Sequence, residues 1–295
     1  MFLEFSKYYF IKSSLKKLPK AITDGFSLND DLILNLASFN TLGGYYRILN
    51  PFIRDSYRLD IKLMDENIFN KFMLECLYII KREDKMDKLL FFYAMILNYI
   101  HDKHLISYIN AIKDPKLSLG SSMNMIDFYL AQKYDDLDLS RENLYKKYPK
   151  AFKLPAYAIE LVHQPLLKVC MQFSSPSMLD KCSKRRAFIS RFMVKPNWIN
   201  KAILSTHDFI FRFKDKYRLK DLLYLKKLDT RLLNLSKNEY EVDGIKYNNT
   251  LDDVIGEAKR EAILKLNALN DYLFNNHDKQ LRREFNISDD INLDD

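Results

Sequence analysis

The chain has 295 residues, of which 47 % are hydrophobic and only six are glycine. It is long enough to bury a large core, and the shortage of glycine favours long helices over folds rich in hairpins. The net charge of +8 is uneven, because residues 181–231 carry fifteen Lys and Arg against four Asp, a local charge of +11 that leaves −3 for the remainder.

Cysteine usage and hydropathy limit the compartment in which we expect the protein. Three widely spaced cysteines, Cys76, Cys170 and Cys182, form no CxxC motif, which argues against a thiolate zinc site and a disulfide framework. The N-terminus has no signal-peptide core, and the longest apolar run, 89–97, is too short to span a bilayer. These features predict a soluble, cytoplasmic protein.

Apolar residues recur with a spacing near 3.6 through most of the chain, which predicts helices. The expected helices cover 6–18, 30–39, 65–82, 87–111, 121–133, 140–148, 155–173, 177–194, 197–213, 218–235 and 249–275. Only 236–249 could hold a short strand or an extended loop. The prediction is a single all-α, multi-helix bundle over residues 1–284, followed by an acidic, disordered tail at 285–295.

Local signals mark the starts of several helices and the centre of the bundle. Asp65 is expected to cap the helix at 65–82, and Pro155 suits the first turn of the helix that follows it. Asn249 or Thr250, followed by the acidic Asp252 and Asp253, marks the start of the last long helix. The range 87–111 is the most apolar, so we expect it at the centre.

Two histidines and an aspartate lie within four positions of this central helix, in the sequence His101-Asp102-Lys103-His104. Each residue turns the helix by about 100°, so Asn98 and Asp102 share one face while both histidines fall on the neighbouring face. Metal ligands must converge on one point, and a His pair at i, i+3 supplies at most half of a zinc site. We therefore interpret His101 and His104 as structural residues that lie at the solvent edge of the helix or form hydrogen bonds.

Five segments resemble, in order and spacing, bacterial proteins of the zinc-dependent phospholipase C family. They are SKYYFIKSSLKKLPKAI (6–22), DLILNLASFNTLGGYYRILNPF (31–52), LMDENIFNKFMLECLYIIK (63–81), DKLLFFYAMILNYIHDKHLISYINAIK (87–113) and MIDFYLAQK (125–133). Residues 232–262 resemble the family's C-terminal helix more weakly. The resemblance implies the all-helical fold of zinc-dependent phospholipase C and P1 nuclease, a zinc cluster, and hydrolysis of phospholipid phosphodiesters.

Most positions that hold zinc ligands in the resembled family carry other residues here. In chain order these positions fall on Lys7, Thr41, Met64, Asn98, Asp102, Ile106, Leu119 and Met123. Only Asp102 retains a ligand type, and Asp127 matches a family aspartate in a supporting role. One carboxylate among apolar and cationic side chains does not offset the desolvation of a divalent cation, so we predict no metal cofactor, whereas the family uses zinc.

The first functional hypothesis is therefore a non-catalytic homologue that binds a phosphorylated or lipid headgroup, or a protein partner. The pocket candidates are Lys7, Thr41, Met64, Asn98, His101, Asp102, His104 and Asp127. Lys7 could meet a phosphate itself, or it could pair with Asp102 in place of the lost cation. We predict that these two charged groups lie within salt-bridge distance. The alternative is an active phosphodiester hydrolase that holds one or two metals through Asp102, His101, His104 and Asp127.

The basic segment supports a third hypothesis, an interaction protein that contacts an anionic membrane surface or, less favoured, nucleic acid. Its candidate contact residues are Lys184, Arg185, Arg186, Arg191, Arg212, Lys214, Lys216 and Arg218. Lys and Arg mixed with Phe, Tyr and Trp198 are typical of such surfaces. Asp215 and Asp221 interrupt the second half and weaken the case for nucleic acid. A solvated helical face remains the simpler interpretation of this composition.

Overall fold

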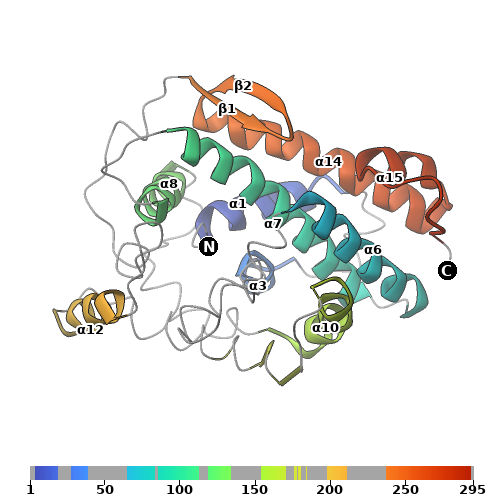
Figure 1. The fold of residues 1–295 in the computed structure, drawn as a ribbon, viewed down its shortest axis with the longest axis horizontal. Helices are drawn as coiled ribbons and strands as arrows, with labels where there is room; N and C mark the ends of the chain where they lie inside the picture. The colour runs from blue at the N-terminus through green and yellow to red at the C-terminus, as the bar shows by residue number, and fades with distance from the viewer. Residues whose placement is uncertain are drawn as a thin grey trace.

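The computed structural model describes residues 4–18, 28–38, 65–83, 86–112, 119–133, 154–170, 176–177, 179–180, 184, 198–210 and 237–293. Across these residues the predicted all-α class is confirmed, with one two-stranded hairpin as the exception (Figure 1). The helices expected at 140–148 and 218–235, and most of the one at 177–194, lie outside the described residues. None of the described helices combines the length and the hydropathy of a membrane-spanning segment.

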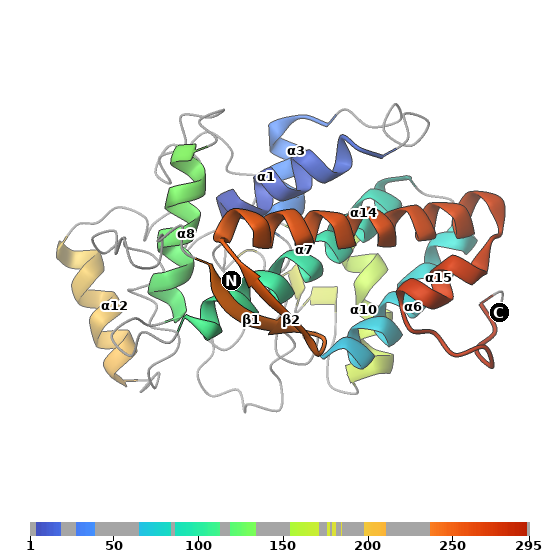
Figure 2. The same ribbon diagram turned by 90° about the horizontal axis from the view of Figure 1, so that it is seen from above.

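The centre of the bundle is α7 (Met86–Ala111), which matches the helix expected at 87–111 to within one residue. Its apolar side chains face all directions around the axis, as expected of a helix that is surrounded by others. Figure 2 shows α1 (Glu4–Leu15) and α3 (Asp30–Ser38) on one side of α7, and α6 (Glu66–Glu83) and α10 (Ala156–Cys170) on the other. All four pack against α7, and α8 (Leu119–Lys133) contacts both α1 and α7.

The predicted start of α6 is confirmed, since Asp65 Oδ1 accepts the backbone N–H of Ile68 at 3.1 Å. The start of α10 differs slightly, because Pro155 lies just before the helix instead of in its first turn. The helix expected at 155–173 includes Pro165, and this proline does lie inside α10. A proline there removes the N–H that would reach the carbonyl of Leu161. The thiol of Cys76 points at that carbonyl instead, with Sγ 4.0 Å from the oxygen.

The stretch 236–249 forms the one hairpin of the described residues, β1 (Asn238–Val242) and β2 (Ile245–Asn249), which confirms it as the place for a strand. The strands are antiparallel, in a register from Asn238 opposite Asn249 to Val242 opposite Ile245. The connecting Asp243 and Gly244 have φ of 51° and 78°, as the two-residue turns of tight hairpins require. The hairpin packs on α7 through β1.

Helix α14 (Leu251–Asn275) begins where the sequence predicted. Thr250 and Asp253 form a capping box, in which each side chain accepts the other residue's backbone N–H. The helix lies along α7 and also contacts α1, the hairpin strand β2 and α15 (Asp278–Glu284). It therefore joins the C-terminal part of the chain to the central helix.

The expectation of a disordered tail differs from the structure, which describes residues 285–293 as packed against the bundle. Phe285, Ile287 and Leu293 are buried. The carbonyl of Phe285 accepts a hydrogen bond from the amide of Asn70 at 2.8 Å, and the Tyr272 hydroxyl donates to the carbonyl of Leu293. Three apolar side chains interspersed among the acidic residues are sufficient to hold this segment in place.

Candidate functional site

The motif that first raised the question of a metal lies in the interior of the fold. Asn98, His101, Asp102, Lys103 and His104 are all buried on α7. Charged groups are found at such depth only when they are paired or bind metals. The partners of these side chains therefore indicate what the motif does.

Asp102 is neutralised by Lys7, which extends from α1. The Lys7 ammonium donates to Asp102 Oδ2 at 2.8 Å, and both side chains are almost completely buried. Burial alone would raise the pKa of Asp102, but the positive charge of Lys7 and the hydrogen bond from His101 outweigh it and hold the pKa well below its usual value. The predicted pairing of Lys7 with Asp102 is confirmed.

His101 links the same carboxylate to α1. Its Nδ1 lies 3.0 Å from Asp102 Oδ1, and its Nε2 lies 2.7 Å from the Ser6 hydroxyl. Burial lowers the pKa of His101 to about 4 despite the opposing influence of Asp102, so the ring is neutral at pH 7. Since a carboxylate only accepts, Nδ1 must carry the single ring proton, and Ser6 then donates to Nε2.

Asp127 belongs to the same neighbourhood, where sequence analysis assigned it a supporting role. One of its carboxylate oxygens accepts the backbone N–H of Ser6 at 2.8 Å. Ser6 lies in the first turn of α1, where backbone N–H groups have no partner inside the helix and the helix dipole favours a negative charge. Asp127 thereby joins α8 to the start of α1, and Asn98 joins α7 to α3 by donating to the carbonyl of Leu36 at 2.9 Å.

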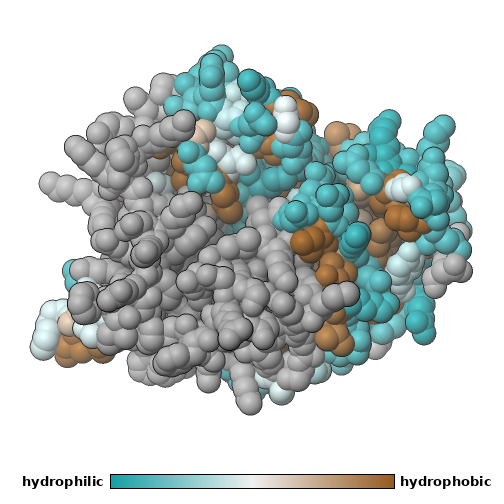
Figure 3. Space-filling view, in the orientation of Figure 1, coloured by the Kyte–Doolittle hydropathy of each residue, from teal (hydrophilic) through white to brown (hydrophobic). Residues whose placement is uncertain are grey.

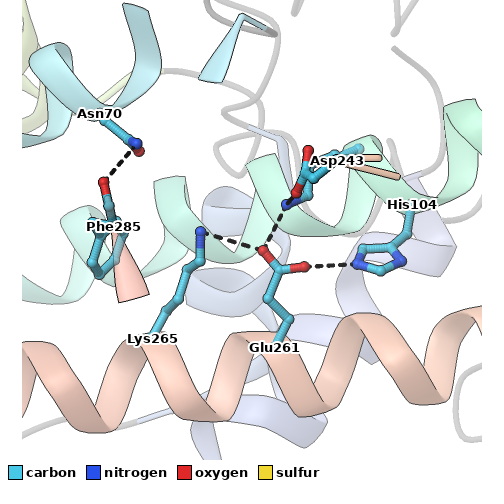
Figure 4. A network of polar contacts seen from close by, with 7 residues as sticks. Asn70, His104, Asp243, Glu261, Lys265 and Phe285 are labelled. Carbon is cyan, nitrogen blue, oxygen red and sulfur yellow. Dashed lines mark hydrogen bonds and ion pairs between the residues drawn. The ribbon is translucent and has the colours of Figure 1, made fainter. Parts of the chain in front are cut away.

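The other half of the motif faces α14 and the hairpin (Figure 4). Lys103 donates to Asp243 in the hairpin turn and to Glu261 on α14, the latter at 2.7 Å. Nε2 of His104 lies 2.8 Å from the second oxygen of Glu261, and Lys265 approaches the first at 3.3 Å. Burial would raise the pKa of Glu261, but the bond to His104 and the two lysines lower it to about 2.

Sequence analysis missed Ser6 and Glu261. Glu261 did carry a signal, because it interrupts the apolar stripe of α14 directly beside Ala258 and Ala262. A carboxylate on a buried stripe requires a cationic partner. Ser6 carried no comparable signal, since a serine beside a lysine near the start of a helix is unremarkable.

The other predicted site residues can be located only in part. Thr41 and Met64, and the basic residues Arg185, Arg186, Arg191, Arg212, Lys214, Lys216 and Arg218, lie outside the described residues. Lys184 is exposed and pairs with Asp180 at 2.5 Å. Met123, at a position where the resembled family has a glutamate ligand, is buried in the core.

With this geometry established, the chain was compared with models of known families, with curated proteins and with solved structures. None of the three comparisons finds a match. The function must therefore be argued from the side chains themselves.

The donor set does not fit a zinc cluster. His101 and His104, proposed above as substitute ligands, take part in separate networks, and the two carboxylate oxygens of Asp102 are occupied by Lys7 and His101. An ammonium 2.8 Å from the only retained ligand would repel a divalent cation. Among the described residues, no three His, Cys, Asp or Glu side chains lie close enough together to hold a metal ion.

Ser6, His101 and Asp102 do follow the hydrogen-bond order of a hydrolytic triad, from hydroxyl to imidazole to carboxylate. The neutral ring could in principle accept the proton of Ser6. However, Ser6 and His101 are almost completely buried, so a substrate carbonyl has no approach to the hydroxyl in this conformation. The network that Ser6, Lys7, His101, Asp102 and Asp127 form, called here the first network, is therefore better suited to a structural role than to catalysis.

A groove of about 840 Å³ lies elsewhere, between α6 and α10. Five of its charged side chains are paired with one another, Lys168 with Glu75 at 2.6 Å and Lys88 with Glu83 and Glu160. None of residues 98–104 lines it. It offers neither a cluster of one charge nor contact with the buried motif.

Proposed function

We propose that this protein is a metal-independent, non-catalytic relative of the zinc-dependent phospholipases C, which acts by binding and not by hydrolysis. The observation that carries the proposal is the buried ion pair between Lys7 and Asp102. At the position where the resembled family has a histidine ligand, this chain has a side chain that brings its own positive charge. The Lys7 ammonium thereby neutralises the negative charge of the retained Asp102, as a metal cation would otherwise do.

The pair also bears on the kind of ligand. The charge of the buried Lys7 is already neutralised by Asp102, so the phosphorylated or lipid headgroup considered above would have to bind elsewhere. The polar groups of the first network, from Ser6 to Asp127, hold α1, α7 and α8 together. We therefore assign residues 98–104 to the scaffold and expect the binding surface on the outside of the molecule.

The test is metal analysis of the purified, untagged protein combined with thermal unfolding. We expect far less than one equivalent of zinc, and the same melting temperature with and without a strong chelator, because no three His, Cys, Asp or Glu side chains of the described residues lie close enough together to hold a metal ion. Hydrolysis of a chromogenic phosphodiester should stay at the buffer rate after zinc or manganese is added. Zinc near one equivalent, together with a melting temperature that falls on chelation, would refute the proposal.

A further inference from the structure

The helix α12 (Trp198–Ile210) exposes an apolar face, although it belongs to the most basic part of the chain. Trp198 is 78 % exposed, Ile199 49 % and Ile203 48 %, while Leu204 is 1 % exposed. At about 100° per residue, the three exposed side chains fall within one arc and Leu204 points away from it. The helix thus buries Leu204 on one side and presents an apolar surface on the other.

This face lies at the periphery of the fold. Figures 1 and 2 place α12 at one end of the molecule, apart from α7 and α14, and among the described elements it packs extensively on none. In the space-filling view, hydrophobic atoms are visible at the same edge (Figure 3). Trp198 is by far the most exposed of the large apolar side chains that the structure describes.

Charge decides between the possible occupants of this face. Residues 181–231, which include α12, carry a local charge of +11. A second copy of the chain would bring the same positive charge and be repelled, whereas an anionic surface would be attracted. Nucleic acid is less suitable, because bases stack on aromatic rings but gain little from Ile199 and Ile203. Isoleucine and tryptophan beside Lys and Arg are the combination that enters the interface of an anionic bilayer.

We infer that the apolar face of α12, formed by Trp198, Ile199 and Ile203, docks onto the surface of an anionic lipid bilayer. The excess of Lys and Arg that the sequence places before and after α12 supplies a general attraction to an anionic surface, and the three apolar side chains enter the boundary between headgroups and acyl chains. This surface is separate from residues 98–104. The inference therefore stands or falls independently of the relation to phospholipase C.

The chain contains a single tryptophan, so its fluorescence reports on this face alone. The free protein should emit at long wavelength, as a water-exposed indole does. Vesicles of phosphatidylcholine with phosphatidylglycerol should shift the emission of Trp198 to shorter wavelength and protect it from quenching by acrylamide. Vesicles of phosphatidylcholine alone, or high salt, should weaken the effect strongly, because the attraction is screened.

Variants that retain the tryptophan test the contact itself. Ile199→Ser combined with Ile203→Ser should lower the affinity for anionic vesicles by about tenfold or more, since two apolar side chains no longer enter the interface. The matched control is Leu264→Ser with Phe274→Ser, two residues of α14 that are 48 % and 56 % exposed. The control should bind like the unmodified protein.

Several results would overturn the inference. One is an unshifted emission with anionic vesicles, and another is an equal response to neutral vesicles. Emission of the free protein at short wavelength would contradict the exposure of Trp198. Self-association that disappears in the Ile199→Ser, Ile203→Ser variant would assign the face to a second copy, and a shift with DNA or RNA but not with vesicles would assign it to nucleic acid.

Discussion

Replacing Lys7 by methionine is the most direct perturbation of the buried ion pair. Methionine keeps most of the side-chain volume but removes the charge and the hydrogen bond to Asp102. Asp102 would then lie in the interior with its hydrogen bond from His101 but without a cation. Removing one partner of a buried pair typically costs about 3–5 kcal/mol, which is a large part of the roughly 5–15 kcal/mol that stabilises a domain.

The double variant Lys7→Met, Asp102→Asn separates the lost attraction from the stranded charge. Asparagine keeps an oxygen that can accept from His101 Nδ1 but needs no counter-charge. We expect the double variant to be more stable than Lys7→Met alone by about 2 kcal/mol, because most of the cost of the single change is an unpaired buried carboxylate.

Urea unfolding followed by far-UV circular dichroism measures these differences, with the slope against urea checked for constancy across the set. The reasoning fails if Lys7→Met changes the free energy of unfolding by less than about 0.5 kcal/mol. It fails equally if the effects of the two substitutions add, since two residues that share an ion pair must be coupled.

Three further predictions concern stability. The pKa of His101 is about 4 in the folded protein and 6.5 in the unfolded chain. Between these two pH values, His101 therefore binds a proton mainly in the unfolded chain. The free energy of unfolding should therefore fall by about 3 kcal/mol as the pH drops from 6.5 to 4, and His101→Gln should flatten this profile. Glu261→Gln should destabilise by about 2–4 kcal/mol in urea unfolding, because buried cations lose their counter-charge. Glu257→Gln is the matched control and should change stability by less than about 0.5 kcal/mol, because Glu257 forms an ion pair with the exposed Arg260 on the same helix. Thr250→Ala should lower the melting temperature in proportion to a loss of about 1 kcal/mol, and an unchanged melting temperature would contradict the role of the capping box seen with Asp253.

The sequence predicted those parts of the fold that depend on neighbouring residues. The apolar composition of 87–111 identified the central helix, and Asn249 or Thr250 with the acidic Asp252 and Asp253 located the start of α14. The Asp243-Gly244 turn lies within the only stretch expected to be extended. Each of these signals is contained within a few residues, so no knowledge of the tertiary arrangement was needed.

Partners that come from distant parts of the chain were harder to predict. Periodicity shows which face of a helix is buried but not which helix covers it, so His104 could not be matched with Glu261, 157 residues further on. Lys7 and Asp102 were matched only because the resemblance placed them at neighbouring ligand positions. The tail at 285–293 was misjudged for a related reason: its acidic composition outweighed Phe285 and Leu293, whose burial depends on the surface they meet.

The four consecutive residues 101–104 therefore need no metal to explain why they are polar and buried. Successive side chains of a helix point in different directions, so His101 and Asp102 reach α1 while Lys103 and His104 reach the hairpin and α14. Asp102 and Glu261 each meet at least one ammonium, which allows both carboxylates to stay charged in the interior. If the four side chains converged on one point, the motif would resemble part of a metal site. Because they diverge, they instead join α1, the hairpin and α14 to the central helix.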